Sequence, residues 1–185
     1  MHITFQPATL DEHFEQIILL QKQNIYTSLS AERQVEQGFV FAEHTTELLK
    51  SMAARLPQII ALADGKVVGY NLAMHVSMKD HLPSLAPMFA EFEKCAYKND
   101  KLIDHRFVVG GQVCVDSNFR GMGLLSKLYN ATKSYLPNDY ELLVTEVSTR
   151  NKVSLKAHQK MGFEIIHTYD DGVEVWDVIA WDMRN

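Results

Sequence analysis

Cysteines, long apolar runs and metal-ligand clusters are scarce in this chain, and each shortage excludes a class of protein. Two cysteines, Cys95 and Cys114, stand among 185 residues without C-x-x-C or Cys/His spacing, so neither a disulfide framework nor a metal site is expected. No apolar run approaches the ~20 residues of a transmembrane helix. The opening residues MHITFQP lack the basic and apolar segments of a secretory signal. We therefore expect a cytoplasmic protein with no metal and no membrane partner.

The composition is that of an ordinary globular protein. Hydrophobic residues make up 46% of the chain and charged residues 22%, which is far from disordered or fibrous proteins. A chain of this length corresponds to one domain and can bury a core without disulfides or a structural metal. The sequence thus predicts a single domain over residues 1–185.

The charge distribution is uneven. The net charge is −5, yet residues 101–160 carry nine Lys and Arg against five acids, which leaves −9 for the remainder. A nucleic-acid partner is not expected, because phosphate backbones require a concentrated cationic face. The asymmetry fits either a small-anion site in this segment with an acidic surface for a cation elsewhere, or ordinary solvated faces.

Hydrophobic periodicity predicts a mixed α/β fold. Alternating apolar residues predict strands over 2–7, 58–63, 66–76, 107–115, 140–147, 163–169 and 173–181. Helical spacing predicts a helix capped by Thr9 and further helices over 39–55, within 78–106, over 121–136 and over 151–161. Asp64-Gly65 predicts a hairpin turn. Gly110-Gly111 indicates a bulge or a close approach to the backbone.

Several common catalytic motifs are absent. The sequence has no G-x-x-x-x-G-K-[ST], G-x-G-x-x-G, G-x-S-x-G or H-E-x-x-H. What remains is residues 113–126, VCVDSNFRGMGLLS, in which a strand and a short turn lead to two glycines at a helix start. Such a turn is either a pyrophosphate site, because the first N–H groups of a helix are unpaired and electropositive, or simply a flexible connection.

This turn resembles the pyrophosphate motif Q/R-x-x-G-x-G/A of the GNAT superfamily of acyl-CoA N-acyltransferases. Arg120 and Gly123 match it, and Leu125 stands where Gly or Ala is usual. A second family motif, N-x-x-[AS]-x-x-x-Y-x-x-x-G-F, is similar to residues 151–163, with His158 in the place of the tyrosine. The resemblance covers nearly the whole chain and implies a mostly antiparallel sheet of about seven strands with a central splay, flanked by helices. It also implies that residues 78–106 are an insertion near the acceptor side.

The family assigns cofactor roles to particular positions. It implies acetyl-CoA as co-substrate, with strand N–H groups facing the acyl carbonyl, a turn wrapping the pyrophosphate, and a helix start beside the pantetheine. These groups correspond to Val113, Cys114 and Val115, to Arg120, Gly121, Met122, Gly123, Leu124, Leu125 and Ser126, and to Asn151 and Ser154.

Two side chains are candidates for proton transfer. Glu146 lies where ribosomal-protein N-terminal acetyltransferases of the family have a glutamate base, and its alternative is a strand carboxylate paired with Lys or Arg. His158 is either the acid that protonates the departing thiolate, a residue stacked on the cofactor, or a surface residue. Cys114 is interpreted as a small apolar strand residue rather than a nucleophile.

The resemblance implies transfer of an acetyl group to a primary amine by direct attack in a ternary complex. The alternative is a non-catalytic acyl-CoA-binding or regulatory module of the same fold. A peptide or protein α-amine, a polyamine, an amino acid and an aminoglycoside remain open as acceptors, and homodimerisation is also left open. The aromatic residues Phe89, Phe92 and Tyr97 are interpreted as packing, with an acceptor pocket as the alternative.

Overall fold

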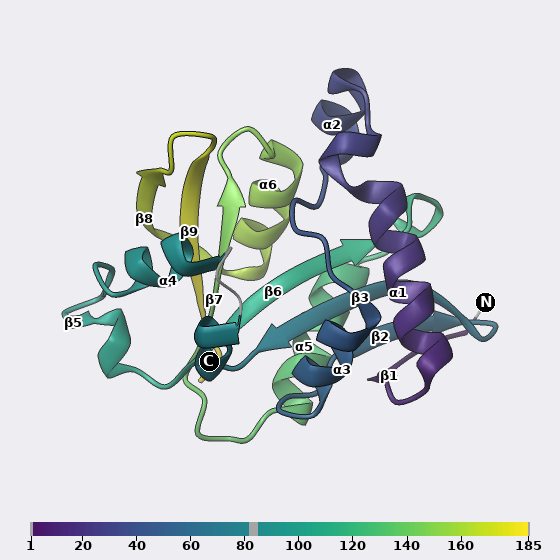
Figure 1. Ribbon diagram of the computed structural model, residues 1–185, viewed down its shortest axis with the longest axis horizontal. Helices are drawn as coiled ribbons and strands as arrows, with labels where there is room; N and C mark the ends of the chain where they lie inside the picture. The colour runs from purple at the N-terminus through teal and green to yellow at the C-terminus, as the bar shows by residue number, and fades with distance from the viewer. Residues whose placement is uncertain (1, 82–84, 185) are drawn as a thin grey trace. The chain divides into compact units, whose positions relative to one another are not determined.

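The computed structural model describes residues 2–81 and 85–184 (Figure 1). The chain divides into two compact units. The first comprises the chain up to Met74 together with Gly111–Leu136, and the second runs from His75 to Gly110 and onward from Pro137. Within the described residues, one sheet has the strand order β1 (Ile3–Pro7), β2 (Ile59–Ala63), β3 (Lys66–Met74), β6 (Phe107–Val115), β7 (Leu142–Ser148), β9 (Val175–Asp182) and β8 (Glu164–Asp170).

The strand pairing confirms the predicted fold class. The pairs β1–β2, β2–β3, β7–β9 and β9–β8 are antiparallel. The pair β6–β7 is parallel and joins Phe107–Val109 to Leu142–Val144. A mixed, mostly antiparallel α/β sheet of seven strands is therefore observed over the described part of the chain.

In the first unit the β2–β3 hairpin turns at Asp64-Gly65, as predicted. Both residues have positive φ, 49° and 79°, the conformation of the tight turns that match the twist of paired strands. Helices α1 (Asp11–Asn24) and α3 (Thr46–Ala53) lie on one face of this part of the sheet and α5 (Leu124–Tyr135) on the other (Figure 1).

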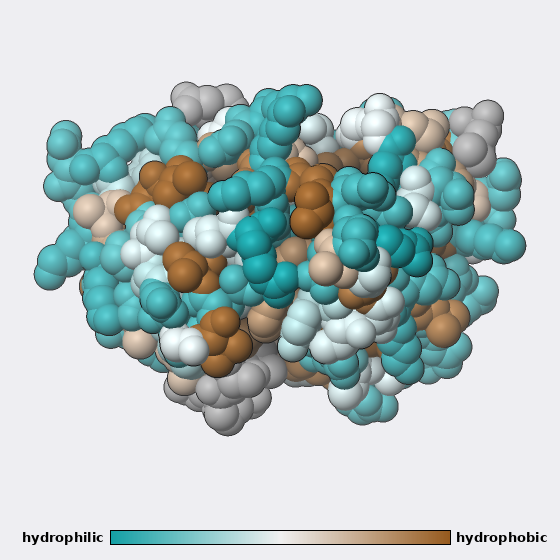
Figure 2. Space-filling model, turned by 90° about the horizontal axis from the view of Figure 1, so that it is seen from above, coloured by the Kyte–Doolittle hydropathy of each residue, from teal (hydrophilic) through white to brown (hydrophobic). Residues whose placement is uncertain are grey.

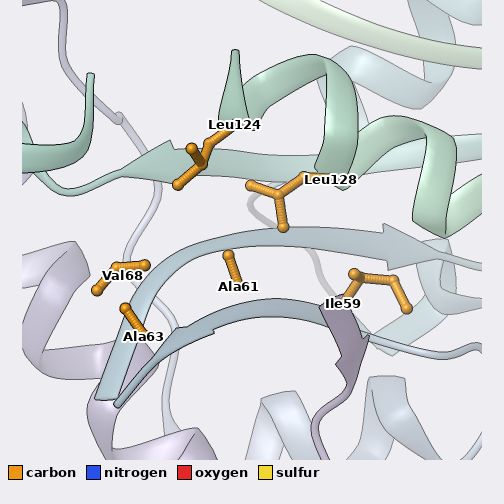
Figure 3. Packing of buried hydrophobic residues seen from close by; sticks show 6 residues of the cluster. All are labelled: Ile59, Ala61, Ala63, Val68, Leu124 and Leu128. Atoms are coloured by element: carbon orange, nitrogen blue, oxygen red, sulfur yellow. The ribbon is translucent and has the colours of Figure 1, made fainter. Parts of the chain in front are cut away.

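The core under α5 fixes the position of that helix. Leu124 and Leu128 of α5 point toward Ile59, Ala61 and Val68 of the strands (Figure 3), and all are buried. A Cβ at Gly69 would lie 3.3 Å from the Cδ1 of Leu128 and 3.2 Å from the Cys114 carbonyl. The absence of a side chain at position 69 thus allows the helix to pack directly on the strand.

The prediction of one helix over residues 39–55 is wrong. A short helix, α2 (Ala31–Gln37), ends at Gly38 with φ 69°, and α3 begins after Thr45, whose hydroxyl accepts from the Leu48 N–H at 3.2 Å. The residues between lie outside any helix, and Val40 forms a strand-like bridge in which its N–H donates to the Asn24 carbonyl and its carbonyl accepts from the Tyr26 N–H. The apolar residues here are buried or half-buried in a connection that is not helical.

The N-cap assigned to Thr9 is also wrong. Helix α1 begins at Asp11 after Leu10. The Nδ1 atom of His13 accepts from the N–H groups of Thr9 and Leu10, at 3.2 and 3.4 Å. The imidazole therefore accepts from the N–H groups of residues 9 and 10, whereas an N-cap hydroxyl at Thr9 would accept from those of residues 11 or 12.

In the second unit the last two strands form the predicted hairpin, and α6 (Lys152–Met161) precedes it. Helix α6 ends at Gly162 with φ 102°, as its motif predicts. The register pairs Trp181 with Leu143 and Trp176 with Ser148, so the two tryptophans face opposite sides of the sheet. The rings of Trp181 and Phe163 lie 6.0 Å apart, which places the end of α6 on the Trp181 face.

The segment that includes residues 78–106 precedes β6 in the second unit. It includes 3-10 turns (Val76–His81 and Leu102–Asp104), helix α4 (Ala86–Phe92) and the strand pair β4 (Ala96–Tyr97) and β5 (Asp100–Lys101); residues 82–84 lie outside the described chain. The helix expected within 78–106 is observed and ends at Phe92. Phe92 contacts both Phe89 and Phe107 edge-on, at 6.0 and 6.1 Å, so Phe89 and Phe92 pack against each other as interpreted.

The face drawn in Figure 2 carries hydrophobic residues in small separate groups among hydrophilic ones. Within the described chain, every helix is too short or too polar to cross a bilayer.

Candidate functional site

The turn after β6 is held at its start by Asp116. The Asp116 N–H donates to the Val68 carbonyl at 2.9 Å, and the Asp116 carboxylate accepts from the Asn118 N–H at 2.8 Å. This fixes the 3-10 turn Ser117–Phe119 that leads into the glycine segment. These bonds therefore fix the direction in which the chain leaves β6 toward the start of α5.

Two glycines give this turn an open backbone. Gly121 and Gly123 have φ values of 77° and 72°, and a Cβ built at either position would meet no atom within 4 Å. By helix geometry, the N–H groups of Leu124, Leu125 and Ser126 have no partner inside α5 and carry the positive end of its dipole. Both the shape and the charge of the turn fit a pyrophosphate.

The hydrophobic residues of the turn divide between the core and the surface. Leu124 is 2% exposed and anchors the helix start in the core, whereas Met122 is 47% exposed. Leu125 and Ser126 are half-buried. The N–H donors of the first helical turn belong to the main chain, so they are present although Leu125 replaces the Gly or Ala of the family motif.

The Arg120 side chain binds the protein itself. Its guanidinium donates to the Val115 carbonyl at 3.2 Å, to the Gln37 carbonyl at 3.0 Å and to the Asn24 Oδ1 at 2.6 Å. Asn24 is in turn held by a 2.8 Å bond from its Nδ2 to the Leu20 carbonyl. Arg120 therefore ties the turn to the ends of α1 and α2, and the main-chain groups of the turn are the ones suited to an anion.

The strand residues assigned to the acyl group lie at the end of β6. Val113 and Val115 are half-buried, and Cys114 is 6% exposed. Burial raises the pKa of the Cys114 thiol to about 12, so the thiolate needed by a nucleophile is not formed near neutral pH. The interpretation of Cys114 as an apolar strand residue is confirmed.

Glu146 has an unusual environment on β7 in the second unit. Its Oε2 atom accepts a 2.5 Å hydrogen bond from the Tyr169 hydroxyl. Burial, reinforced by the negative charge of Asp171, raises the pKa of this carboxyl to about 7, although the Tyr169 bond opposes the rise. The partner that the described residues supply is a phenol and not the Lys or Arg of the alternative interpretation.

The second motif forms the start of α6. Asn151 is the N-cap, and its Oδ1 accepts from the Ser154 N–H at 3.2 Å. His158 is 2% exposed, so it is not a surface residue. Its Nδ1 lies 2.8 Å from the Ser154 carbonyl, and because a carbonyl only accepts, Nδ1 carries the ring proton. Burial lowers the pKa of His158 to about 4, so the ring is neutral at physiological pH.

The two candidates for proton transfer are not brought together on one face. The His158 ring contacts Phe163 edge-on at 5.0 Å, and Phe163 lies against Trp181, which pairs with Leu143. Successive strand residues alternate, so Glu146 points to the opposite face of β7. The role of His158 as an acid stays a prediction, and the neutral ring of the ligand-free protein holds no second proton to give.

The spacing of the motifs did not predict the residues that interact with Glu146. Tyr169 lies two strands away on β8, and Asp171 follows in the turn. The register connects them: Ser148 pairs with Trp176, and Trp176 pairs with Tyr169. Glu146 and Tyr169 therefore share a face, and the alternation of the last two strands is the only sequence signal that could have indicated this.

Among the described residues, no group of three or more His, Cys, Asp or Glu side chains could hold a metal ion.

Comparison with known proteins identifies the family. Residues 22–163 match the Acetyltransferase (GNAT) family. The chain belongs to this family. A search of curated proteins finds no match.

Solved structures with this fold are distant in sequence. Ard1 from Thermoplasma volcanium is 17% identical with a TM-score of 0.66, over 98% of both chains. Arabidopsis thaliana NAA60 in complex with acetyl-CoA is 13% identical with a TM-score of 0.66, over 98% of this chain and 99% of that one. The ribosomal-protein-S18-alanine N-acetyltransferase from Escherichia coli is 11% identical with a TM-score of 0.62, over 98% and 94%. These similarities establish the fold.

Proposed function

We propose that this chain transfers an acetyl group from acetyl-CoA to a primary amine, by direct attack of the amine in a ternary complex. The coarser statement, that it is a GNAT-family acetyltransferase, follows from the family match. The amine as acceptor is our inference, and it is carried by the buried Glu146 carboxyl bonded to Tyr169. A carboxyl that titrates near neutral pH can take the proton that an ammonium must lose before it attacks a thioester.

The cofactor part of the proposal rests on the glycine turn. Acetyl-CoA supplies the activated acetyl thioester when it is bound. The N–H groups of residues 121–126 would hold its pyrophosphate, since the turn is open and lies at the electropositive end of a 12-residue helix. The solved NAA60 structure of the same fold contains acetyl-CoA, which supports the same co-substrate here.

Further roles follow from the positions of the remaining residues. The main chain of Val113, Cys114 and Val115 would donate to the acyl carbonyl and favour the oxyanion that develops during attack. Asn151 and Ser154 would lie beside the pantetheine, with their mutual cap fixing the start of α6. The free and buried cysteines fit a reducing, cytoplasmic location.

A non-catalytic acyl-CoA-binding module remains the second candidate, because His158 stands in the place of the family tyrosine and is neutral. The deciding experiment measures CoA release with a panel of primary amines: peptide α-amines, polyamines, amino acids and aminoglycosides. The proposed function requires at least one amine to be acetylated by the wild type. Acetyl-CoA binding without acetylation of any amine would favour the module.

Acetyl-CoA and CoA are each expected to raise the melting temperature. A ligand that binds only the folded state at a hundredfold excess over its Kd stabilises that state by about 2.7 kcal/mol, which is roughly 5–10 °C for a chain of this size. AMP is expected to have little effect, because it lacks the pyrophosphate and the pantetheine. Differential scanning fluorimetry checks this, and an unchanged Tm at millimolar acetyl-CoA would contradict the cofactor assignment.

A further inference from the structure

Glu146 and Tyr169 form a carboxyl–phenol pair within the second unit. The Tyr169 hydroxyl donates to Oε2 of Glu146 at 2.5 Å. Each carboxylate oxygen can accept on its own. The bond therefore fixes the orientation of the carboxylate and leaves Oε1 as the oxygen that can take a proton.

The phenol is suited to donate and not to act as a base. Burial and the neighbouring carboxylates of Glu146, Asp171 and Glu91 raise the pKa of Tyr169 far above its usual value. The hydroxyl consequently keeps its proton across the working range of pH. The ring of Tyr169 is stacked on the ring of His167 at 6.2 Å, and His167 Nε2 lies 3.2 Å from Glu91 on α4, so the phenol is held in place from its own strand and from the helix.

Asp171 is held beside the pair by the hairpin turn. Its Oδ1 accepts from the N–H groups of Val173 and Glu174 at 2.8 and 2.7 Å, and its Oδ2 accepts from the Trp176 indole at 2.9 Å. The pKa of the Tyr169 phenol is thus raised by three carboxylates, those of Glu146, Asp171 and Glu91. Burial and Asp171 oppose ionisation of Glu146, while the Tyr169 bond favours it.

We propose that Tyr169 is the positioning residue of Glu146, and that its hydroxyl hydrogen bond orients the carboxylate for the incoming amine. The proposal rests on the proposed function of Glu146 as the base. It assigns Tyr169 an action through Glu146, and not a contact with the substrate. Two opposing neighbours, the phenol on β8 and the carboxylate of Asp171 in the turn, then set the pH at which the base becomes active.

The test compares the pH dependence of Tyr169→Phe with that of the wild type. Loss of the hydroxyl removes the interaction that favours the ionised carboxylate, so the ascending limb of kcat/KM is expected to move upward by roughly one pH unit or more. Tyr140→Phe is the matched control, since it removes a hydroxyl from a half-buried ring next to Arg106 in the same unit. Its profile is expected to coincide with that of the wild type.

A second variant, Asp171→Asn, is expected to move the ascending limb of kcat/KM to lower pH. Asp171→Asn keeps an oxygen for the turn hydrogen bonds and removes the negative charge that opposes ionisation of Glu146. Its ascending limb is therefore expected to lie below that of the wild type. A Tyr169 with a merely structural role would lower kcat/KM by the same factor at every pH, and that outcome would overturn the proposal.

Carbon-13 NMR of the glutamate carboxyls provides a readout that needs no acceptor. The Glu146 signal is identified by its absence in Glu146→Gln, and its titration in the ligand-free protein is expected to shift upward in Tyr169→Phe. An unchanged titration would overturn the inference even if Glu146→Gln is inactive. Failure of every amine in the panel would instead contradict the proposed function and leave this measurement valid.

Discussion

Glu146→Gln is expected to bind acetyl-CoA like the wild type and to lose a factor of about 10² to 10⁴ in kcat/KM, the usual contribution of a positioned acid or base. The amide keeps the size of the side chain and an oxygen for the Tyr169 hydrogen bond, but it cannot take a proton from the amine. Steady-state kinetics with a confirmed acceptor measure the loss, and isothermal titration with acetyl-CoA measures binding.

The matched control is Glu164→Gln, which changes an exposed glutamate on β8. Its kcat/KM is expected to stay within about twofold of the wild type, since exposed substitutions away from a site have small effects. Near-full activity of Glu146→Gln would mean that solvent or another carboxylate takes the proton. Loss of activity together with loss of acetyl-CoA binding would point to a structural role.

The same substitution tests the environment of Glu146 through stability. The folded-state pKa of about 7 lies above the ordinary 4.5, so the neutral form is favoured by folding. Its stabilising contribution is present in full below pH 4.5 and is lost as the pH rises through 7. Glu146→Gln avoids this loss, and its melting temperature is expected to exceed that of the wild type at about pH 8, by roughly 2–8 °C, and to match it near pH 4.5.

Comparing the melting temperatures at two pH values separates the effect of the Glu146 carboxyl from that of other titrating groups. His158 also has a shifted pKa, lowered by burial, and the folded protein loses stability as the pH falls toward 4 because the ring must then be protonated. This loss is common to the wild type and the variant and cancels in the difference. A difference in Tm that does not depend on pH would contradict the raised pKa of Glu146.

Features set by neighbouring residues could be predicted from the sequence. The Asp64-Gly65 turn, the glycines before α5 and the Asn151 and Gly162 ends of α6 depend on a few consecutive residues. Local preferences for positive φ and for capping are strong enough to be read directly. The same is true of the strands whose apolar residues alternate or run continuously.

Features set by contacts across the chain could not be predicted. Residues 39–45 have an apolar pattern that also fits a helix, yet they lie outside any helix, and Val40 is hydrogen-bonded to Asn24 and Tyr26 instead. Arg120 fits a phosphate ligand in the motif, yet its guanidinium is used by Asn24, Gln37 and Val115 from distant parts of the sequence. Hydrogen bonds to residues distant in the sequence determine both the conformation at Val40 and the orientation of the Arg120 side chain.

Gly123→Glu is expected to abolish the thermal shift by acetyl-CoA while the domain stays folded. Position 123 is exposed and has φ 72°, with no atom within 4 Å of a built Cβ, so a larger side chain has room and extends into the turn. A carboxylate there repels the pyrophosphate and competes with it for the main-chain donors of residues 124–126. Far-UV circular dichroism checks the fold, and isothermal titration checks the loss of binding.

Two control variants distinguish the effect of the introduced negative charge from the effect of strain in a left-handed backbone. Gly123→Gln carries the same strain, roughly 1 kcal/mol, and the same bulk without the charge, so it is expected to keep more of the thermal shift than Gly123→Glu. Gly172→Glu places the same residue at φ 85° in the β8–β9 turn and tests strain and charge elsewhere. Arg120→Ala is expected to weaken binding only in part, because the main-chain donors remain although the contacts to Asn24 and Gln37 are lost. An intact acetyl-CoA shift in a folded Gly123→Glu would move the pyrophosphate site to another part of the chain.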